Sequence, residues 1–299
     1  MTDQAIIHSS NVLNAERRVV ATRTSVWALT AVAAVTFMMS SAVNKAAAAP
    51  LFTLNPSAIV GVGAAFTGTS LTLNDFSTVK FSGPAAGGGI SFTESGYLPV
   101  VSVAQGVNTV NTPGLTTDYS IYFFFTGSGT QDSANVTGQI TNGSFQNLSL
   151  SLFVASGATT FGFNSTTNNP VILSGNAGTL VASGGLLAGG DNFVSTRPST
   201  TGARFAPSAG VTTTVSPVLA QAAFFAQPNP FYSTEMSTFI NLSDQINPLF
   251  TGNTVSGFQI NAAGGGVTNF VATAVPEPAS LFLLGASLAM VGLVRRRLS

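Results

Sequence analysis

Seven acidic side chains lie in the central part of the chain, residues 50–274, and their carboxylates could carry acid–base or metal chemistry. A pair about 5 to 10 Å apart would suit a glycosidase, and carboxylates with carbonyl oxygens would suit Ca²⁺. Their local sequence instead indicates turns and strand ends: Asp132 lies in TQDSAN, Asp75 follows Asn74, and Asp191 follows two glycines. No D-x-D-x-D-G loop is present, so we expect neither a catalytic pair nor a metal site. The seven acids are Asp75, Glu94, Asp118, Asp132, Asp191, Glu235 and Asp244.

Nucleophilic catalysis lacks its usual partners in this part of the chain. Cysteine is absent and the only histidine, His8, lies before residue 50, which excludes Ser-His-Asp and Cys-His nucleophiles and His/Cys zinc sites. Ser77 and Lys80 have S-x-x-K spacing, but Lys80 is the only lysine there, so the accompanying K-T-G element is missing. We therefore predict that the protein is not an enzyme and uses no cofactor. Glycine groups lie at 61–63, 87–89 and 264–266, but the residues that complete a phosphate-binding loop do not follow them. We expect these glycines to form turns.

Charge is scarce throughout the chain. Only 7% of the 299 residues are charged, against about 25% in an ordinary soluble domain. The central part has three basic residues, Lys80, Arg197 and Arg204, so it offers no basic field and we expect no nucleic-acid partner. A nearly neutral surface with few charges between strands favours self-association, although we expect most of the 23 phenylalanines in the core.

The central part has the sequence pattern of strands and turns. Residues 145–154 alternate leucine and serine, which predicts a half-buried strand, and residues 119–126 are apolar on both faces, which predicts a central strand. We expect further strands at 211–215, 222–225 and 270–273, a short helix near 235–240, and long loops at 175–190 and 197–207. The expected fold is all-β: one domain, residues 50–274, folded as a jelly-roll-like β-sandwich with long loops.

The N-terminal part, residues 1–49, has the three regions of a secretory signal peptide. Three arginines precede the uncharged stretch 26–39, and small residues follow it, so we expect a signal helix cleaved at Ala47, Ala48 or Ala49. An uncleaved membrane anchor is the alternative, but fourteen helical residues span only about 21 Å of a hydrocarbon core about 30 Å thick. Arg17 and Arg18 also raise a twin-arginine export route.

The C-terminal part, residues 275–299, contains Pro276-Glu277-Pro278, then the apolar stretch 281–294, then Arg295, Arg296 and Arg297. The order predicts an extended motif, a short transmembrane helix and a positive cluster that stays on the cytoplasmic side. This end resembles the PEP-CTERM sorting signal recognised by exosortases in Gram-negative bacteria. The resemblance implies a transient inner-membrane anchor, processing near the PEP motif by an exosortase-type enzyme, and delivery of the body to the cell surface or extracellular matrix.

Several segments of the body resemble flocculation-associated PEP-CTERM proteins. They are residues 52–56, residues 119–130, residues 224–232, and the glycines 264–266 before Asn269. The third segment contains Pro228-Asn229-Pro230-Phe231-Tyr232. In that family the implied role is to help cells that produce exopolysaccharide aggregate into flocs, with no cofactor and no reaction.

The expected function is therefore that of an exported, exosortase-processed surface or matrix protein that promotes aggregation with exopolysaccharide, as in flocs and biofilms. Two alternatives stay open. One is a carbohydrate-binding or calcium-dependent lectin-like module, in which exposed aromatics such as Tyr97, Tyr122 or Tyr232 would stack on sugar rings. The other is a polysaccharide hydrolase that uses two of the seven acids.

Overall fold

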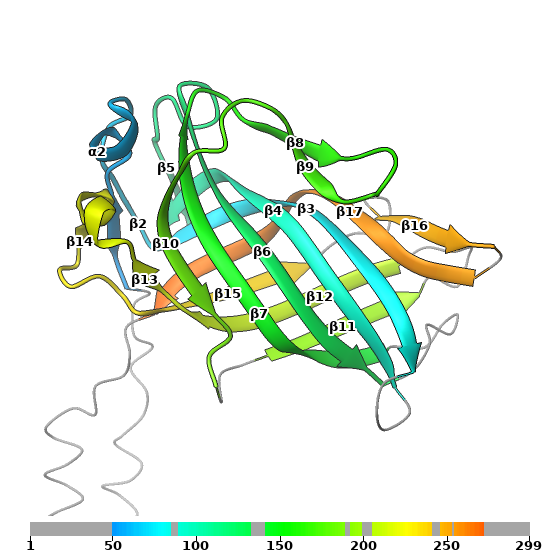
Figure 1. The fold of residues 1–299 in the computed structure, drawn as a ribbon. Helices are drawn as coiled ribbons and strands as arrows, with labels where there is room; N and C mark the ends of the chain where they lie inside the picture. Colours follow the sequence, from blue (N-terminus) through cyan, green and yellow to red (C-terminus); the bar gives the residue numbers. More distant parts are fainter. Residues whose placement is uncertain are drawn as a thin grey trace, which may run out of the picture. The chain divides into compact units, whose positions relative to one another are not determined.

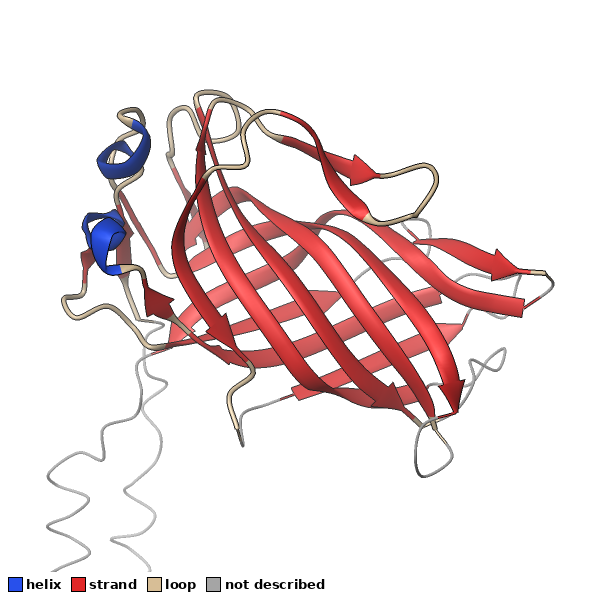
Figure 2. Cartoon of the chain, in the orientation of Figure 1, coloured by secondary structure: helices blue, strands red, loops and turns tan. Residues whose placement is uncertain are grey.

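The computed structural model is built almost entirely from β-strands (Figure 2). The described residues all belong to one compact unit, residues 49–299. Its two helical segments are short: α2 (Ser57–Val60) and the 3-10 helix η1 (Leu219–Phe224). No helix in the described part of the chain is long and apolar enough to cross a bilayer. The structure describes residues 50–84, 89–132, 141–188, 192–198, 205–240, 246–252 and 254–271.

Eight antiparallel strands form a closed, barrel-like sheet (Figure 1). Their order is β11-β12-β15-β17-β3-β4-β6-β7, and β7 pairs again with β11, where Val194 lies opposite Gly143. Most neighbours in the sheet are also neighbours in sequence, as in an up-and-down barrel. The eight strands are β3 (Ser70–Pro84), β4 (Ile90–Gln105), β6 (Tyr119–Gln131), β7 (Thr141–Ser156), β11 (Asn192–Pro198), β12 (Phe205–Thr214), β15 (Thr234–Ile240) and β17 (Thr254–Val271).

This topology confirms the all-β class and differs from the jelly-roll-like sandwich expected from the sequence. A sandwich packs two separate sheets, whereas here one sheet closes on itself through the pairing of β7 with β11. Alternation along a strand indicates that one face is buried, and it does so equally in a sandwich and in a barrel. The closure depends on pairing between distant segments, which the local pattern does not specify.

Shorter strands extend or cover the barrel. β10 pairs with β7, where Leu150 lies opposite Gly184, and β8 and β9 form a hairpin of their own outside the barrel wall (Figure 1). β1, β2 and β14 form a separate three-stranded sheet in the order β14-β1-β2. The shorter strands are β1 (Phe52–Leu54), β2 (Phe66–Gly68), β5 (Asn108–Val110), β8 (Thr160–Phe163), β9 (Pro170–Ser174), β10 (Thr179–Gly185), β13 (Ser216–Pro217), β14 (Phe225–Gln227) and β16 (Ile246–Thr251).

The two most clearly patterned strands are confirmed. Residues 145–154 lie in β7, with Leu150 and Leu152 buried and Ser149 exposed. Residues 119–126 lie in β6 and are buried on both faces through residue 123. The outer face is buried because the β8–β9 hairpin covers it: the rings of Tyr122 and Phe161 pack edge to face, 5.0 Å apart. The strand expected at 211–215 is also confirmed, since β12 extends through Thr214.

Four local expectations are wrong. Residues 235–240 form β15 instead of a helix, because Glu235 and Phe239 alternate with exposed residues and β12 and β17 pair on either side. Most of 222–225 belongs to η1, and the expected loop 175–190 contains β10. The glycines at 264–266 lie inside β17, where the register with β3 shifts between Ala262 and Gly266. Such a shift is a bulge, for which glycine is suited.

The interior of the barrel contains two apolar clusters. The first includes Leu71, Leu73, Leu98 and Val100, and the second includes Val79 and Phe92. Along β3 and β4, the inward-facing residues between these clusters are polar or small: Asp75, Ser77, Glu94 and Gly96. A polar layer therefore separates the two halves of the core, and it contains the groups with the most unusual environments.

Candidate functional site

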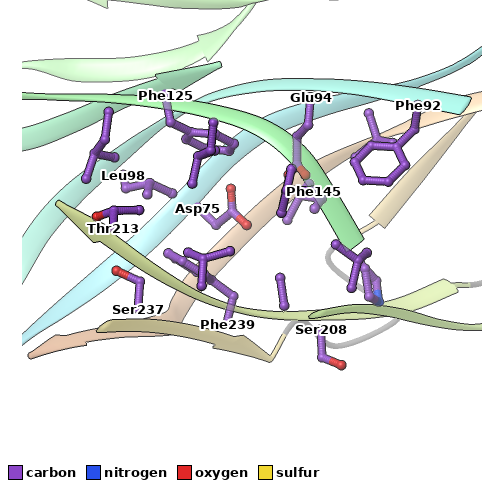
Figure 3. Close-up of a pocket in the computed structure, with 18 of the residues that line it drawn as sticks. Asp75, Phe92, Glu94, Leu98, Phe125, Phe145, Ser208, Thr213, Ser237 and Phe239 are labelled. Carbon is purple, nitrogen blue, oxygen red and sulfur yellow. The ribbon is translucent and has the colours of Figure 1, made fainter. Parts of the chain in front are cut away.

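Three acids line one cavity inside the barrel, and Figure 3 labels two of them, Asp75 and Glu94. Asp75 comes from β3, Glu94 from β4 and Glu235 from β15, and the cavity has a volume of about 60 Å³. The expectation that these acids lie in turns or at strand ends is wrong, because each lies within a strand on its inward face. By contrast, Asp132 is exposed just after the end of β6, as its turn-like sequence predicted. Asp191 and Asp244 lie outside the described residues.

Glu235 is held by hydroxyl groups instead of a cation. Thr213, its cross-strand neighbour in β12, donates a hydrogen bond of 2.8 Å from Oγ1 to Glu235 Oε1, and Ser237 donates one of 3.4 Å to the same oxygen. Ser237 also hydrogen-bonds Thr268 on β17. Burial raises the pKa of Glu235 to about 7, and the hydroxyls of Thr213, Ser237 and Thr268 offset only part of this rise.

The pKa of Glu94 is raised further than that of Glu235. Burial raises its pKa to about 8, and the nearby Asp75 carboxyl adds to the rise, since two like charges resist ionising together. The Ser77 hydroxyl offsets a small part of this. Gly127 lies directly opposite Glu94 on β6, and a Cβ at this position would lie 2.9 Å from the Phe145 ring.

The size of the cavity limits what the acids can do. Sites for small molecules are usually about 300 to 1,000 Å³, so a cavity of about 60 Å³ does not hold a sugar chain between two carboxyls. Among the described residues, no group of three or more His, Cys, Asp or Glu side chains is placed to hold a metal ion. The three carboxyls are therefore spread around the cavity instead of forming one coordination site.

A second, open hollow lies on the outside of the barrel. Its volume is about 660 Å³, and β6, β7 and the end of β10 form its floor. The polar residues that line it carry hydroxyl or amide groups and no charge: Thr126, Ser128, Gln146, Asn147 and Ser149.

The hollow belongs to a wider pattern of uncharged polar side chains on the outer face. In the strand register, Ser95 on β4 lies opposite Thr126, which lies opposite Ser149 on β7. A parallel row begins at Thr93 and continues through Ser128 and Asn147. Since neighbouring strands lie about 4.7 to 4.9 Å apart, hydroxyl and amide groups recur at that interval across the sheet.

The aromatic side chains proposed for sugar stacking are not available for it. Tyr122 is buried, and its hydroxyl donates a hydrogen bond to the Ala177 carbonyl. Tyr97 packs against Tyr122 and Phe161, with ring centroids 5.9 and 5.1 Å away. Tyr232 donates a hydrogen bond of 2.8 Å to the Leu51 carbonyl. All three serve packing within the fold.

The segments that resemble flocculation-associated proteins come together in space. β1 pairs with β14, and the Asn55 amide donates a hydrogen bond of 2.8 Å to the Phe224 carbonyl. Phe52 packs edge to face against Phe270 at the end of β17, with centroids 5.0 Å apart. In Figure 1 this small sheet lies at one end of the barrel. We call β1, β2, β14 and η1 the cap.

The predicted motif Pro228-Asn229-Pro230-Phe231-Tyr232 follows β14 directly within this region. Both X-Pro bonds, Gln227–Pro228 and Asn229–Pro230, are cis. The Phe231 ring lies 4.5 Å from that of Phe225 and 4.9 Å from that of Phe270. The motif thus joins the cap to the barrel core, a structural role without a reactive group.

The comparison with known protein families concerns the C-terminal end. Residues 274–297 match the PEP-CTERM protein-sorting motif. The chain carries a PEP-CTERM sorting signal. Such a signal marks an exported protein that is anchored at the membrane and then processed by an exosortase on its way to the cell surface. No curated protein and no solved structure matches the chain.

The PEP-CTERM match includes Pro276, Glu277, Pro278 and the arginines at 295–297. These residues and the expected cleavage region, Ala47 to Ala49, lie outside the described residues, so their individual roles stay predictions. The inward-facing acids were missed by the sequence analysis, although a signal for two of them was present: Phe92, Glu94 and Leu98 share one face of a strand, as do Glu235 and Phe239.

Proposed function

We propose that this PEP-CTERM protein is a non-enzymatic component of the cell surface or extracellular matrix that promotes cell aggregation with exopolysaccharide, as in flocs and biofilms. The sorting signal at residues 274–297 carries the first half of the proposal, because it directs the body to the compartment where exopolysaccharide accumulates. The outer face of the barrel supports the second half.

The outer face suits contact with a neutral, hydroxyl-rich polymer. Hydroxyl and amide side chains both donate and accept hydrogen bonds, so they match sugar hydroxyls without a charge. Each such contact is weak because it replaces a contact with water. The rows through Thr126 and Ser128 repeat the same groups on β4, β6 and β7, and repeated weak contacts along one polymer add up to stable retention.

A carbohydrate-binding module is therefore the nearest alternative, and it differs mainly in whether binding leads to aggregation. A calcium-dependent lectin would need a group of oxygen ligands outside the cavity, and a hydrolase would need a carboxyl pair open to a polymer. The inward-facing positions of Glu94 and Glu235 on a small cavity do not favour a hydrolase.

Affinity electrophoresis in gels that contain the producing strain's own polysaccharide tests the proposed binding. The mature protein recovered from the cells should be retarded, and the Thr126→Ala, Ser149→Ala double variant should be retarded less. The matched control is Thr109→Ala with Thr238→Ala, exposed threonines of β5 and β15 that do not line the hollow. Equal mobility of all proteins with and without polysaccharide would contradict the proposal, and loss of retardation on adding chelator would select the lectin alternative.

A further inference from the structure

The cavity inside the barrel has the size of a site for a very small molecule. An eight-stranded barrel is just wide enough either to be filled by side chains or to enclose one small ligand. A water molecule requires roughly 10 to 15 Å³ of such space, so about 60 Å³ holds on the order of four to six non-hydrogen atoms. The cavity lies between the polar layer and the second apolar cluster, whose Val79, Phe92 and Phe145 line it.

The polar groups around this space are unbalanced toward acceptors. Three carboxyls line it, and no lysine or arginine is among the described residues that do so. Glu235 is only 1% exposed, and its Oε2 atom has no hydrogen-bond partner among the described residues. An unsatisfied buried carboxyl oxygen is costly. A ligand that supplies a hydrogen-bond donor, and above all a positive charge, would remove that cost.

Apart from Gln131, Ser208, Thr213 and Ser237, the rest of the lining is apolar. Phenylalanines from three different strands, Phe92, Phe125 and Phe145, contribute their rings, and Phe92 and Phe145 pack edge to face with centroids 5.3 Å apart. A short alkyl chain buried among these rings would be favoured by roughly 0.8 kcal/mol for each methylene group. The cavity thus combines acidic groups with a hydrophobic wall.

We propose that the cavity binds a small primary alkylammonium ion. The ammonium group has three donors and no acceptor, and it donates to Glu235 while the alkyl chain packs among the phenylalanines. Asp75 and Glu94 lie on the same cavity and favour the cation further through their negative potential when ionised. This site is separate from the outer face, so the inference is independent of the proposed polysaccharide binding.

Thermal unfolding of the full-length chain with n-butylammonium chloride tests the proposal. A ligand that binds only the folded state raises the midpoint in a concentration-dependent way. We expect a saturable rise at pH 8, a smaller one at pH 5.5, where Glu235 holds its own proton, and none with equal concentrations of n-butanol or of tetrabutylammonium, which is too large to enter. Equal rises with n-butanol, or no rise at any pH, would overturn the proposal.

The variant Glu235→Gln separates binding in the cavity from binding elsewhere. Loss of the charge-assisted hydrogen bond should weaken n-butylammonium about ten- to a hundredfold in calorimetry. Asp132→Asn removes an exposed carboxyl at the end of β6 and should leave the affinity unchanged. Should Glu235→Gln not fold, a crystal of the natural chain soaked in n-butylammonium decides: density that joins Glu235 to the phenylalanines supports the site, and an unchanged cavity refutes it.

Discussion

Thr213 Oγ1 donates a hydrogen bond of 2.8 Å to Glu235 Oε1 across neighbouring strands, and both residues are almost completely buried. A threonine hydroxyl can donate to a carboxyl in either protonation state, but it brings no positive charge. The interior of this barrel therefore tolerates its acids by keeping them protonated or by pairing them with a bound cation. Several measurable properties depend on whether these acids are protonated or paired with a cation.

Stability should fall as pH rises from about 5 to 8. The pKa values of Glu94 and Glu235 are raised from 4.5 to about 8 and about 7. Between about pH 5 and the folded-state pKa of each group, the unfolded chain has lost that proton and the folded barrel still holds it. The free energy of unfolding therefore decreases by about 1.4 kcal/mol per pH unit for each group. Urea unfolding at pH 5, 6, 7 and 8 measures this, and a flat or rising profile would show that the acids are not protonated in the folded state.

The substitution Glu94→Gln should remove the part of that profile that lies between pH 7 and 8. Between pH 7 and 8 Glu235 has largely ionised, so Glu94 accounts for the remaining slope. An amide cannot ionise, and the variant should show a nearly constant free energy of unfolding over that interval, with a value at pH 8 above that of the natural chain. Asp132→Asn, which alters an exposed carboxyl, serves as the control. The same slope in both variants would rule out Glu94 as its source.

Gly63→Ala should destabilise the fold more than Gly61→Ala. Both glycines have positive φ angles, +84° and +74°, at which a side chain is strained by about 1 kcal/mol or more. A Cβ on Gly63 would also lie 2.5 Å from Cε1 of Tyr119, whereas one on Gly61 meets nothing within 4 Å. We expect a further loss of about 1 to 3 kcal/mol for Gly63→Ala. Equal losses by chemical denaturation would mean that the segment before β2 does not pack on Tyr119.

Phe52→Ala should loosen the cap from the barrel. The Phe52 ring is fully buried and packs on Phe270, so its removal is expected to cost about 3 to 5 kcal/mol. Tyr232→Phe, which removes only the hydrogen bond to Leu51, should cost about 1 kcal/mol. Hydrogen exchange of the Asn55 amide, which is bonded to Phe224, reports on the cap locally. Unchanged protection of that amide in Phe52→Ala would show that the cap is held in another way.

The parts of the fold that follow from local patterns could be predicted from the sequence. Alternating leucine and serine in β7 placed the strand and its buried face correctly. Closure of the sheet could not be predicted, because it depends on three residues of β7 pairing with β11 about fifty positions away. The positions of the carboxyls were predicted wrongly for a related reason. Glu94 and Glu235 follow the two-residue period of their strands, but charged residues rarely face the interior of a protein, so the pattern favoured turns or strand ends. The cap joins two segments, residues 52–56 and 224–232, that the sequence showed only as separate resemblances.

Sedimentation of cell aggregates tests the proposed role of the protein most directly. Cells that lack the gene would be compared with cells that carry the natural gene, and with cells whose copy encodes the Thr126→Ala, Ser149→Ala double variant or the Thr109→Ala, Thr238→Ala control. We expect small, slowly settling flocs without the gene, recovery with the natural and control copies, and partial recovery with the double variant. Flocs of equal size and settling rate with and without the gene would contradict the account.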